Sequence, residues 1–184
     1  AHVLKNLKRE IKIGITTKCL NTLAEKLCCA KGGTPGFKGY HGFPYAICAS
    51  KNDEIVHGFP DDVPLKDGDI LSIDFGTLFK GWYSDSAFTV NVGDENNRTY
   101  RLMKVGKECL QIGIKTAGQH GRVGDISYAI QTHAESNGFS VVKDFVGHGI
   151  GKNLHEKPSI PNWGNKNEGV LMKPGMVIAI EPML

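Results

Sequence analysis

The sequence lacks the features that would place it among membrane or nucleic-acid-binding proteins. Its 184 residues include no apolar run long enough to cross a bilayer, and the N-terminal stretch AHVLKNLKRE is not a signal peptide. The formal net charge is only +3, and no run of Lys and Arg is interleaved with aromatic residues. We therefore expect a cytoplasmic protein that binds neither membranes nor nucleic acid directly.

The cysteines also lack a recognisable pattern. There are five of them, an odd number, with no CxxC pair, so neither a disulfide framework nor a zinc site is indicated. We expect reduced thiols. What is present is the composition of a globular protein, with 40% hydrophobic and 22% charged residues, and a length of 184 residues that predicts one domain over residues 1–184.

Periodicity and turn residues predict both helices and strands. Thr16 or Thr17 is expected to cap a helix whose apolar residues follow helical spacing and which ends at the glycine pair 32–33. Further helices are expected at about 97–110 and 125–138. Strands are expected at 45–50, 70–79, 82–92, 139–145 and 176–181.

Two pairs of similar segments indicate an internal duplication. IKIGITT at 11–17 resembles LQIGIKT at 110–116, and KDGDILSID at 66–74 resembles KPGMVIAIE at 173–181. Both pairs are separated by roughly a hundred residues, which predicts two related halves. The second pair aligns one acid, Asp74, with another, Glu181.

Two aspartates interrupt an otherwise apolar strand pair, GDILSIDFGTLFKGWYSDSAF. If residues 80–81 form a two-residue hairpin turn, Asp74 lies opposite Ala87, and Asp85 lies two residues away on the same face. A three-residue turn would place the acids on opposite faces. Backbone or hydroxyl partners explain either acid alone. Both acids together, with Glu181 in the repeat-related position, favour a divalent cation, because close carboxylates repel each other.

Histidines follow or precede glycine in two further motifs. In GHGIGKNLHEKP, His148 lies between glycines and His155 follows seven residues later. The glycines let the backbone approach another group closely and are expected to leave the His148 imidazole exposed. His57, in IVHGFP, repeats the His-Gly pattern, and a turn near a strand end explains it equally well.

Taken together, the motifs resemble those of the type I methionine aminopeptidases. The resemblance covers nearly the whole chain through IGITT, KGYHGFP, NDEIVHGFPDD, LKDGDILSIDFG, YSDSAFT, GHGIGKNLHEKP and MKPGMVIAIEPM. It implies an α+β pita-bread fold, in which two pseudo-symmetric halves carry a curved antiparallel sheet covered by helices. It also implies metal-dependent removal of the N-terminal methionine from newly made polypeptides.

The resemblance assigns metal ligands residue by residue. Asp74 would bind one divalent ion, Asp85 would bridge two, and His148 and Glu181 would complete the second site. The ions would be Co, Mn or Fe(II), with Zn or Ni as further options. A bridging water would lose its proton and attack the first peptide bond. The general base would be either Glu181 or a second glutamate that the family carries further along the chain.

Substrate contacts are implied in the same way. His57 and His155 would steady the scissile peptide and its developing oxyanion. The pocket for the methionine side chain would be lined by Phe37, Tyr40, Phe43 and Cys48. The partners would be nascent polypeptides that begin with Met, and the resemblance includes association with the ribosome.

The chain departs from the family pattern at both ends. It ends at Leu184, three residues after Glu181 and before the family's fifth metal ligand, and its first helix begins partway at Ala1. We therefore expect the last strands to be missing and the polypeptide as written to be weakly active or inactive, being either a fragment or an incomplete part of a longer chain. An X-Pro peptidase of the same fold and a non-catalytic binding module are the alternatives.

Overall fold

The structure is a computed structural model that describes residues 1–94, 97–118 and 120–184. Its contacts divide the chain into two compact units. Unit 1 comprises Ala1–Thr99 and Lys152–Leu154, and unit 2 comprises Tyr100–Gly151 and His155–Leu184. No helix in the described part of the chain combines the length and the apolar character needed to cross a membrane.

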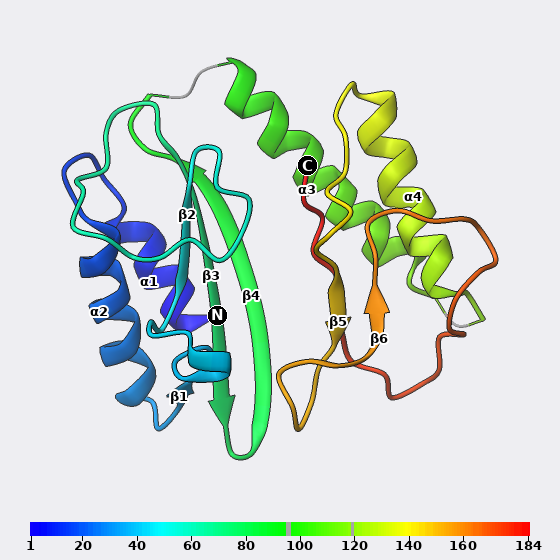
Figure 1. Cartoon of the computed structure of the whole chain (residues 1–184), viewed down its shortest axis with the longest axis horizontal. Coiled ribbons are helices and arrows are strands. Elements are labelled where there is room, and N and C mark those ends of the chain that lie inside the picture. Colours follow the sequence, from blue (N-terminus) through cyan, green and yellow to red (C-terminus); the bar gives the residue numbers. More distant parts are fainter. Residues whose placement is uncertain (95–96, 119) are drawn as a thin grey trace. The chain divides into compact units, whose positions relative to one another are not determined.

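Unit 1 packs two helices against a four-stranded antiparallel sheet (Figure 1). Strands β1 and β2 pair with one edge of β3, and β4 pairs with its other edge. The elements are α1 (His2–Glu10), α2 (Thr17–Cys29), β1 (Thr34–Pro35), a 3₁₀ turn (Tyr40–Gly42), β2 (Cys48–Lys51), β3 (Ile70–Phe79) and β4 (Trp82–Asn91).

Alternation along β3 decides which face of this sheet meets the helices. Leu71, Ile73 and Phe75 are buried and join the core formed with α1 and α2. Because side chains alternate between the two faces of a strand, Asp74 lies on the other face. The acid that interrupts the apolar run therefore faces away from the helix-covered core of unit 1.

The predicted hairpin is confirmed. Lys80 and Gly81 both have positive φ, 49° and 78°, as a two-residue type I′ turn requires. The register places Asp74 opposite Ala87 and Gly76 opposite Asp85. Asp74 and Asp85 are therefore diagonal neighbours on one face, as expected for this turn length.

Unit 2 packs two helices against a three-stranded antiparallel sheet of order β6-β5-β7 (Figure 1). Its core contains apolar residues of both helices, together with Val141 and Ile160. The elements are α3 (Asn97–Thr116), whose first residues belong to unit 1, α4 (Val123–Ser136), β5 (Gly147–Gly149), β6 (Glu156–Ile160) and β7 (Ile178–Ala179). The predicted α+β class is confirmed.

Helix α2 begins as predicted, and α3 is longer than predicted. The Thr16 hydroxyl accepts a hydrogen bond from the Cys19 N–H at 3.2 Å, which caps α2. Helix α3 continues to Thr116 instead of ending near residue 110, because its buried positions Val105, Cys109 and Gly113 keep one helical face against the core. A Cβ at Gly113 would lie 3.1 Å from the Ile130 side chain, so the glycine permits close packing there.

Three predicted strands differ from the structure, and in two of them a partner outside the expected ladder accepts a backbone N–H. The strand expected at 45–50 begins only at Cys48, since the N–H groups of Ala46 and Ile47 donate to the Asn21 side chain. The strand expected at 176–181 is limited to β7. No strand is assigned within the described residues 139–145, where the Val142 N–H donates to the Met183 carbonyl.

The internal repeat is confirmed in one of its two segment pairs. An isolated bridge joins Thr16 to Pro64 just before α2, and another joins Arg122 to Leu171 just before α4. The spacing from Pro64 to Leu171 equals that from Asp74 to Glu181, so the second pair is in register. The first pair is wrong, because residues 110–116 lie within α3 whereas residues 11–16 form the loop before α2.

Candidate metal centre

The first group of candidate ligands lies on the β3–β4 hairpin of unit 1. Asp74 and Asp85 are both half-buried and share the face that does not pack against α1 and α2. Cross-strand diagonal neighbours are separated by about 7–8 Å at the backbone, within reach of one another's side chains. Two carboxylates so placed can supply oxygen ligands to a hard divalent ion.

The second group lies at the junction of β5 and β7 in unit 2. His148 pairs with Ala179 across the ladder, and Glu181 follows Ala179 by two residues. His148 and Glu181 are thus diagonal neighbours around an alanine, just as Asp74 and Asp85 are around Ala87. Each unit therefore carries one pair of candidate ligands placed diagonally across two strands, with the offset toward lower residue numbers for Asp85 and toward higher ones for Glu181.

The hydrogen bonds of His148 fix which of its nitrogens can bind a cation. Nδ1 lies 2.8 Å from the Gly149 carbonyl oxygen, which accepts only, so Nδ1 carries a proton and Nε2 presents its lone pair in the neutral ring. Nε2 lies 3.2 Å from Glu181 Oε1. Two electron-rich atoms at this distance repel unless a proton or a cation lies between them. Imidazole nitrogen and carboxylate oxygen are common ligands of divalent transition metals.

His148 is buried, contrary to the expected exposure; only 7% of its surface is accessible. The flanking glycines explain the difference, because they bring neighbouring strands close to the histidine. A Cβ at Gly147 would lie 2.3 Å from the Ala179 carbonyl oxygen, and one at Gly149 would lie 2.4 Å from that of Lys157. Burial lowers the local dielectric constant and so strengthens the interaction of His148 with a nearby charge.

His155 stands beside His148. The two rings meet edge to face, with centroids 4.3 Å apart and an interplanar angle of 76°. His155 is exposed, so its ring can be reached by a bound molecule while it contacts the buried imidazole. The structure thus brings together three of the predicted residues of unit 2: His148, His155 and Glu181.

His57 lies in unit 1, on an exposed turn that is anchored on both sides. Its φ of 59° is left-handed. The next residue, Gly58, donates its N–H to the Ser50 hydroxyl at 3.1 Å and accepts the Ala49 N–H at 2.9 Å. A Cβ at Gly58 would lie 2.4 Å from the Ala49 carbonyl oxygen. Only glycine therefore allows this loop to lie directly on β2.

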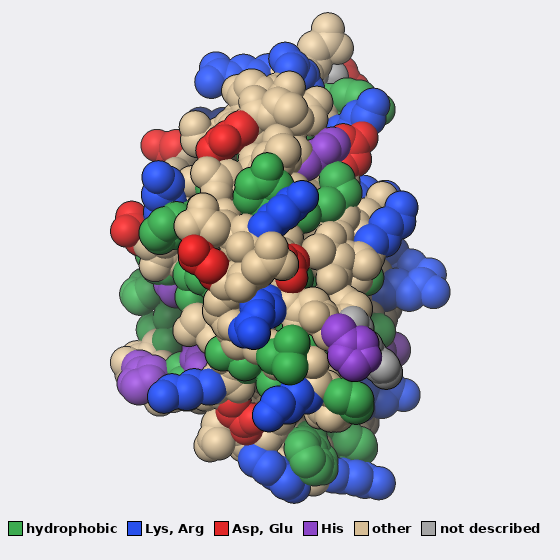
Figure 2. Space-filling view, turned by 90° about the vertical axis from the view of Figure 1, so that its right-hand side faces the viewer, with side chains coloured by type: hydrophobic (Ala, Val, Ile, Leu, Met, Phe, Trp, Pro, Cys, Tyr) green, Lys and Arg blue, Asp and Glu red, His purple; other side chains and the backbone are tan. Residues whose placement is uncertain are grey.

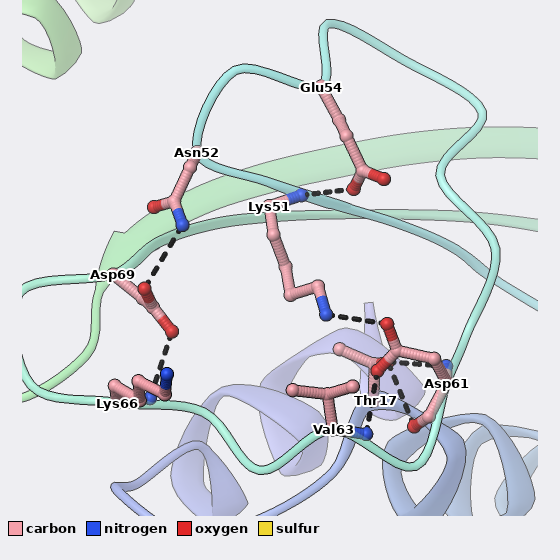
Figure 3. Close-up of polar contacts among 8 residues, drawn as sticks. All are labelled: Thr17, Lys51, Asn52, Glu54, Asp61, Val63, Lys66 and Asp69. Carbon is pink, nitrogen blue, oxygen red and sulfur yellow. Dashed lines mark hydrogen bonds and ion pairs between the residues drawn. The ribbon is translucent and has the colours of Figure 1, made fainter.

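A network of hydrogen bonds and one ion pair anchors the rest of the loop that carries His57, between β2 and Val63 (Figure 3). Lys51 Nζ lies 2.6 Å from Asp61 Oδ2, which closes the loop with an ion pair. The Asp61 N–H donates to the buried Thr17 hydroxyl at 2.8 Å. Burial raises the pKa of Asp61, but the hydrogen bonds from Lys51, Val63 and Thr17 outweigh it and leave the pKa below its usual value.

The predicted pocket residues lie in unit 1 near the same strands. The Phe37 ring is buried against Gly76, where a Cβ would lie 2.5 Å from the ring. Phe43 contacts Phe59 edge to face at 5.3 Å, and Tyr40 is half-buried in the 3₁₀ turn. Sequence reasoning missed Phe59, although it directly follows the His-Gly pair.

Cys48 lies directly opposite Asp74 in the ladder. Burial, followed by the charges of Asp74 and Asp85, raises the pKa of the thiol to about 12. The side chain is therefore a neutral thiol at physiological pH. It can form part of an apolar wall, but it is neither an activated nucleophile nor a thiolate ligand.

Surface charge is mixed on the face shown in Figure 2, where basic and acidic side chains are interspersed. This agrees with the small net charge of +3. The predicted lack of nucleic-acid binding stays a prediction.

Comparison with known proteins identifies the family. Residues 1–184 match metallopeptidase family M24. The chain is 48% identical to methionine aminopeptidase 1 of Bacillus subtilis (strain 168) over 180 residues, which is 98% of this chain and 73% of that protein. It is 46% identical to the methionine aminopeptidase of Clostridium perfringens (strain 13 / Type A), with coverage of 98% and 73%.

Comparison with solved structures also finds methionine aminopeptidases. The methionine aminopeptidase of Rickettsia prowazekii matches with a TM-score of 0.97 and 39% identity, over 98% of this chain and 73% of that one. The prolidase from Pyrococcus horikoshii OT3 matches with a TM-score of 0.84 at 22% identity, over 98% of this chain and 50% of that one, which shows the shared fold alone. The predicted pita-bread fold is confirmed. The chain belongs to metallopeptidase family M24 and, within it, to the methionine aminopeptidases.

Proposed function

We propose that this protein removes the N-terminal methionine from polypeptides by hydrolysing their first peptide bond, using two divalent ions. The observation that carries the proposal is the His148–Glu181 pair, whose facing nitrogen and oxygen need a cation or a proton between them. Membership of a metallopeptidase family favours the cation. We propose that Asp74 and Asp85 supply ligands to the same centre, with Asp85 bridging both ions.

When bound, such ions lower the pKa of water enough to supply hydroxide near neutral pH. The protein's own groups would hold and orient the substrate. His155 and His57 would donate hydrogen bonds to the scissile peptide and to the oxygen that gains charge during attack. Glu181 is our candidate for the general base, unless a further glutamate of the complete protein takes that part.

The methionine side chain would bind among Phe37, Tyr40, Phe43 and Cys48. Its flexible thioether fits a wall of aromatic rings and a neutral thiol. The burial of Phe37 and Cys48 supports this assignment. The contact between Phe43 and Phe59 extends the aromatic surface toward the loop that carries His57.

Metal analysis and peptide hydrolysis test the proposal on the complete protein. We expect divalent metal after purification, loss of Met-Ala-Ser hydrolysis when chelator removes it, and recovery on adding Co, Mn or Fe(II), with Zn and Ni as further trials. His148→Ala should reduce both metal content and hydrolysis. A metal-free preparation with undiminished activity would overturn the proposal.

An X-Pro peptidase is the second candidate function, because several solved relatives of the same fold carry such names. Their identities of 20% and 19% lie well below the 48% found for a methionine aminopeptidase. Parallel assays of Met-Ala-Ser and an X-Pro peptide separate the two. Faster cleavage of the X-Pro peptide would replace our substrate assignment. Metal binding without hydrolysis of either peptide would support the alternative of a binding module.

We further propose that the natural substrates are nascent polypeptides in the cytoplasm, encountered at the ribosome. The names of the relatives support a methionine substrate. Sedimentation of the complete protein with purified ribosomes tests the association. Recovery of the protein in the supernatant alone, at low and at physiological salt, would contradict it.

A further inference from the structure

A buried asparagine contacts the main chain of Glu181. Asn162 follows β6 by two residues and has only 1% of its surface accessible. Its side-chain Nδ2 donates to the Glu181 carbonyl oxygen at 2.8 Å. Since that carbonyl can only accept, the amide must be oriented with its nitrogen toward Glu181. In Figure 1, β6 is orange and the C-terminal segment of the chain is red.

Glu181 requires such a contact because it lies beyond the assigned ladder. Strand β7 ends at Ala179, whose partner across the ladder is His148. Ladder pairing fixes a side chain's direction by fixing its backbone, and Glu181 is two residues past the last pair. The following Pro182 has no N–H and restricts Glu181 to an extended backbone. Two residues after Glu181, the Met183 carbonyl accepts a hydrogen bond from the Val142 N–H at 2.9 Å.

Burial of the Asn162 side chain lowers the stability of the folded protein, which indicates a role other than packing. Its Oδ1 is buried and makes no hydrogen bond among the described residues. An unsatisfied buried amide oxygen destabilises the folded state, whereas a leucine of similar volume would fill the space without that cost. The amide nitrogen has a clear role, because it holds the main-chain carbonyl of Glu181. The carboxylate of the same residue lies beside His148.

We propose that Asn162 is a positioning residue that holds the Glu181 carboxylate against His148 for metal binding. This inference rests on the proposed function, because it gives Glu181 the part of a ligand. Asn162 would act through the main chain of Glu181 and not by direct contact with the ion or the substrate. It sets the backbone at Glu181 so that Oε1 lies 3.2 Å from His148 Nε2 before any ion binds, which lowers the reorganisation that binding requires.

Two substitutions in the complete protein test the proposal. Asn162→Leu removes the donor with little change in volume, and Asn162→Asp keeps the shape but replaces the donor with an acceptor. The control is Asn165→Leu in the same loop, where an exposed amide donates to Glu168 Oε2 at 3.2 Å. The readouts are the dissociation constant for Mn²⁺, the visible absorption spectrum of the Co²⁺ form, and the rate of Met-Ala-Ser hydrolysis.

Both Asn162 variants should bind Mn²⁺ about 10- to 100-fold more weakly than the parent, as is typical when a ligand loses its outer support. The Co²⁺ spectrum should change in position or intensity, a result that lower stability alone would not produce in the folded protein. Asn165→Leu should match the parent in all three readouts. Folded Asn162 variants with unchanged Mn²⁺ affinity and Co²⁺ spectrum would overturn the inference.

If neither Asn162 variant folds, NMR spectroscopy of the parent protein tests the inference instead. The side-chain amide NMR signals of Asn162 should shift when Zn²⁺ is added, whereas those of Asn165 should not. Signals of Asn162 that stay unchanged at saturating Zn²⁺ would also overturn the inference. The two proposals fail differently: a parent that binds no metal refutes the proposed function, whereas a normal parent with indifferent Asn162 variants refutes the positioning role alone.

Discussion

At the scale of single residues, two glycines should respond to alanine in opposite directions. Gly58→Ala would place a Cβ 2.4 Å from the Ala49 carbonyl oxygen, so the His57 loop must move off β2. We expect a loss of roughly 1–3 kcal/mol in the free energy of unfolding and a fall in kcat/KM on the order of 100-fold as His57 shifts. Urea titration and Met-Ala-Ser hydrolysis measure the two effects.

Gly106→Ala is the matched control. Gly106 lies within α3, where a Cβ would lie 3.7 Å from the Leu184 side chain, an ordinary contact. Alanine should raise the free energy of unfolding by about 0.5–1 kcal/mol, since glycine is unfavourable within helices. If both variants were equally stable and active, the close approach of Gly58 to β2 would be wrong.

Asp61 should contribute to stability in a pH-dependent way. Its pKa in the folded protein is below the usual value, because hydrogen bonds from Lys51 and its neighbours outweigh the effect of burial. The contribution is therefore complete above the unfolded pKa of about 3.9 and is lost as pH falls through the folded pKa. Asp61→Asn should cost about 1 kcal/mol at pH 7, a small value because the Asp61 side chain is 38% exposed.

Urea titrations at pH 7 and pH 3 check this prediction. The difference in unfolding free energy between parent and Asp61→Asn should shrink at pH 3, because pH 3 lies below the usual pKa of an aspartate, so the unfolded parent chain binds a proton at this carboxylate. A difference that is equal at both pH values would show that the ionised carboxylate is not what anchors the loop.

At the scale of elements, the first turn of α2 should depend on one hydroxyl. The Thr16 side chain accepts the Cys19 N–H, so Thr16→Ala should lower the free energy of unfolding by about 1 kcal/mol. Thr22 is exposed within the same helix and donates to the Lys18 carbonyl. Thr22→Ala should be neutral or slightly stabilising, because alanine is the better helix former. Thermal unfolding of both variants distinguishes capping from a general effect of removing threonine.

The elements that the sequence predicted well are those whose signal is local. The β3–β4 hairpin follows from alternation and from a Lys-Gly turn with positive φ, and α2 follows from its cap and apolar spacing. The strand expected at 45–50 was too long, because the Asn21 side chain, distant in sequence, takes its first N–H groups. Such competition has no signature in a short window of sequence.

The candidate site was predictable to a similar degree. The motifs identified Asp74, Asp85, His148 and Glu181, and the observed registers place each pair diagonally across a ladder. The burial of His148 and the support from Asn162 were not predictable. Both depend on how closely particular segments approach one another. Glycine and asparagine residues permit such close contacts, but their presence in the sequence does not predict them.

At the scale of the whole molecule, each of the two units has its own hydrophobic core. In unit 1 a short bridge at Thr16 precedes α2, and in unit 2 a short bridge at Arg122 precedes α4. Each half then presents one pair of candidate ligands beyond its core. The length predicts that residues 1–184 form one domain. The reactivity of the cysteines during unfolding can test whether the two units unfold cooperatively.

The five thiols should fall into two classes. Cys19 and Cys29 are exposed, whereas Cys28, Cys48 and Cys109 are buried. Burial also raises the pKa of Cys109 to about 11, and only thiolates react readily with a disulfide reagent. In the complete native protein at pH 8, a disulfide reagent should therefore modify Cys19 and Cys29 quickly and the other three only after unfolding, as peptide mass spectrometry would show. Rapid native labelling of Cys109 would contradict the packing of α3 on α4.

The buried thiols also test the single-domain prediction, because they lie in different cores. Cys28 belongs to the core of unit 1 and Cys109 to that of unit 2. If the units form one cooperative domain, both thiols should become reactive at the same urea concentration, since two-state unfolding exposes every buried group together. Brief labelling at increasing urea, followed by mass spectrometry of the two peptides, gives both midpoints in one experiment. Midpoints that differ by more than the measurement error would show that each core opens separately, and the single-domain prediction would then be wrong.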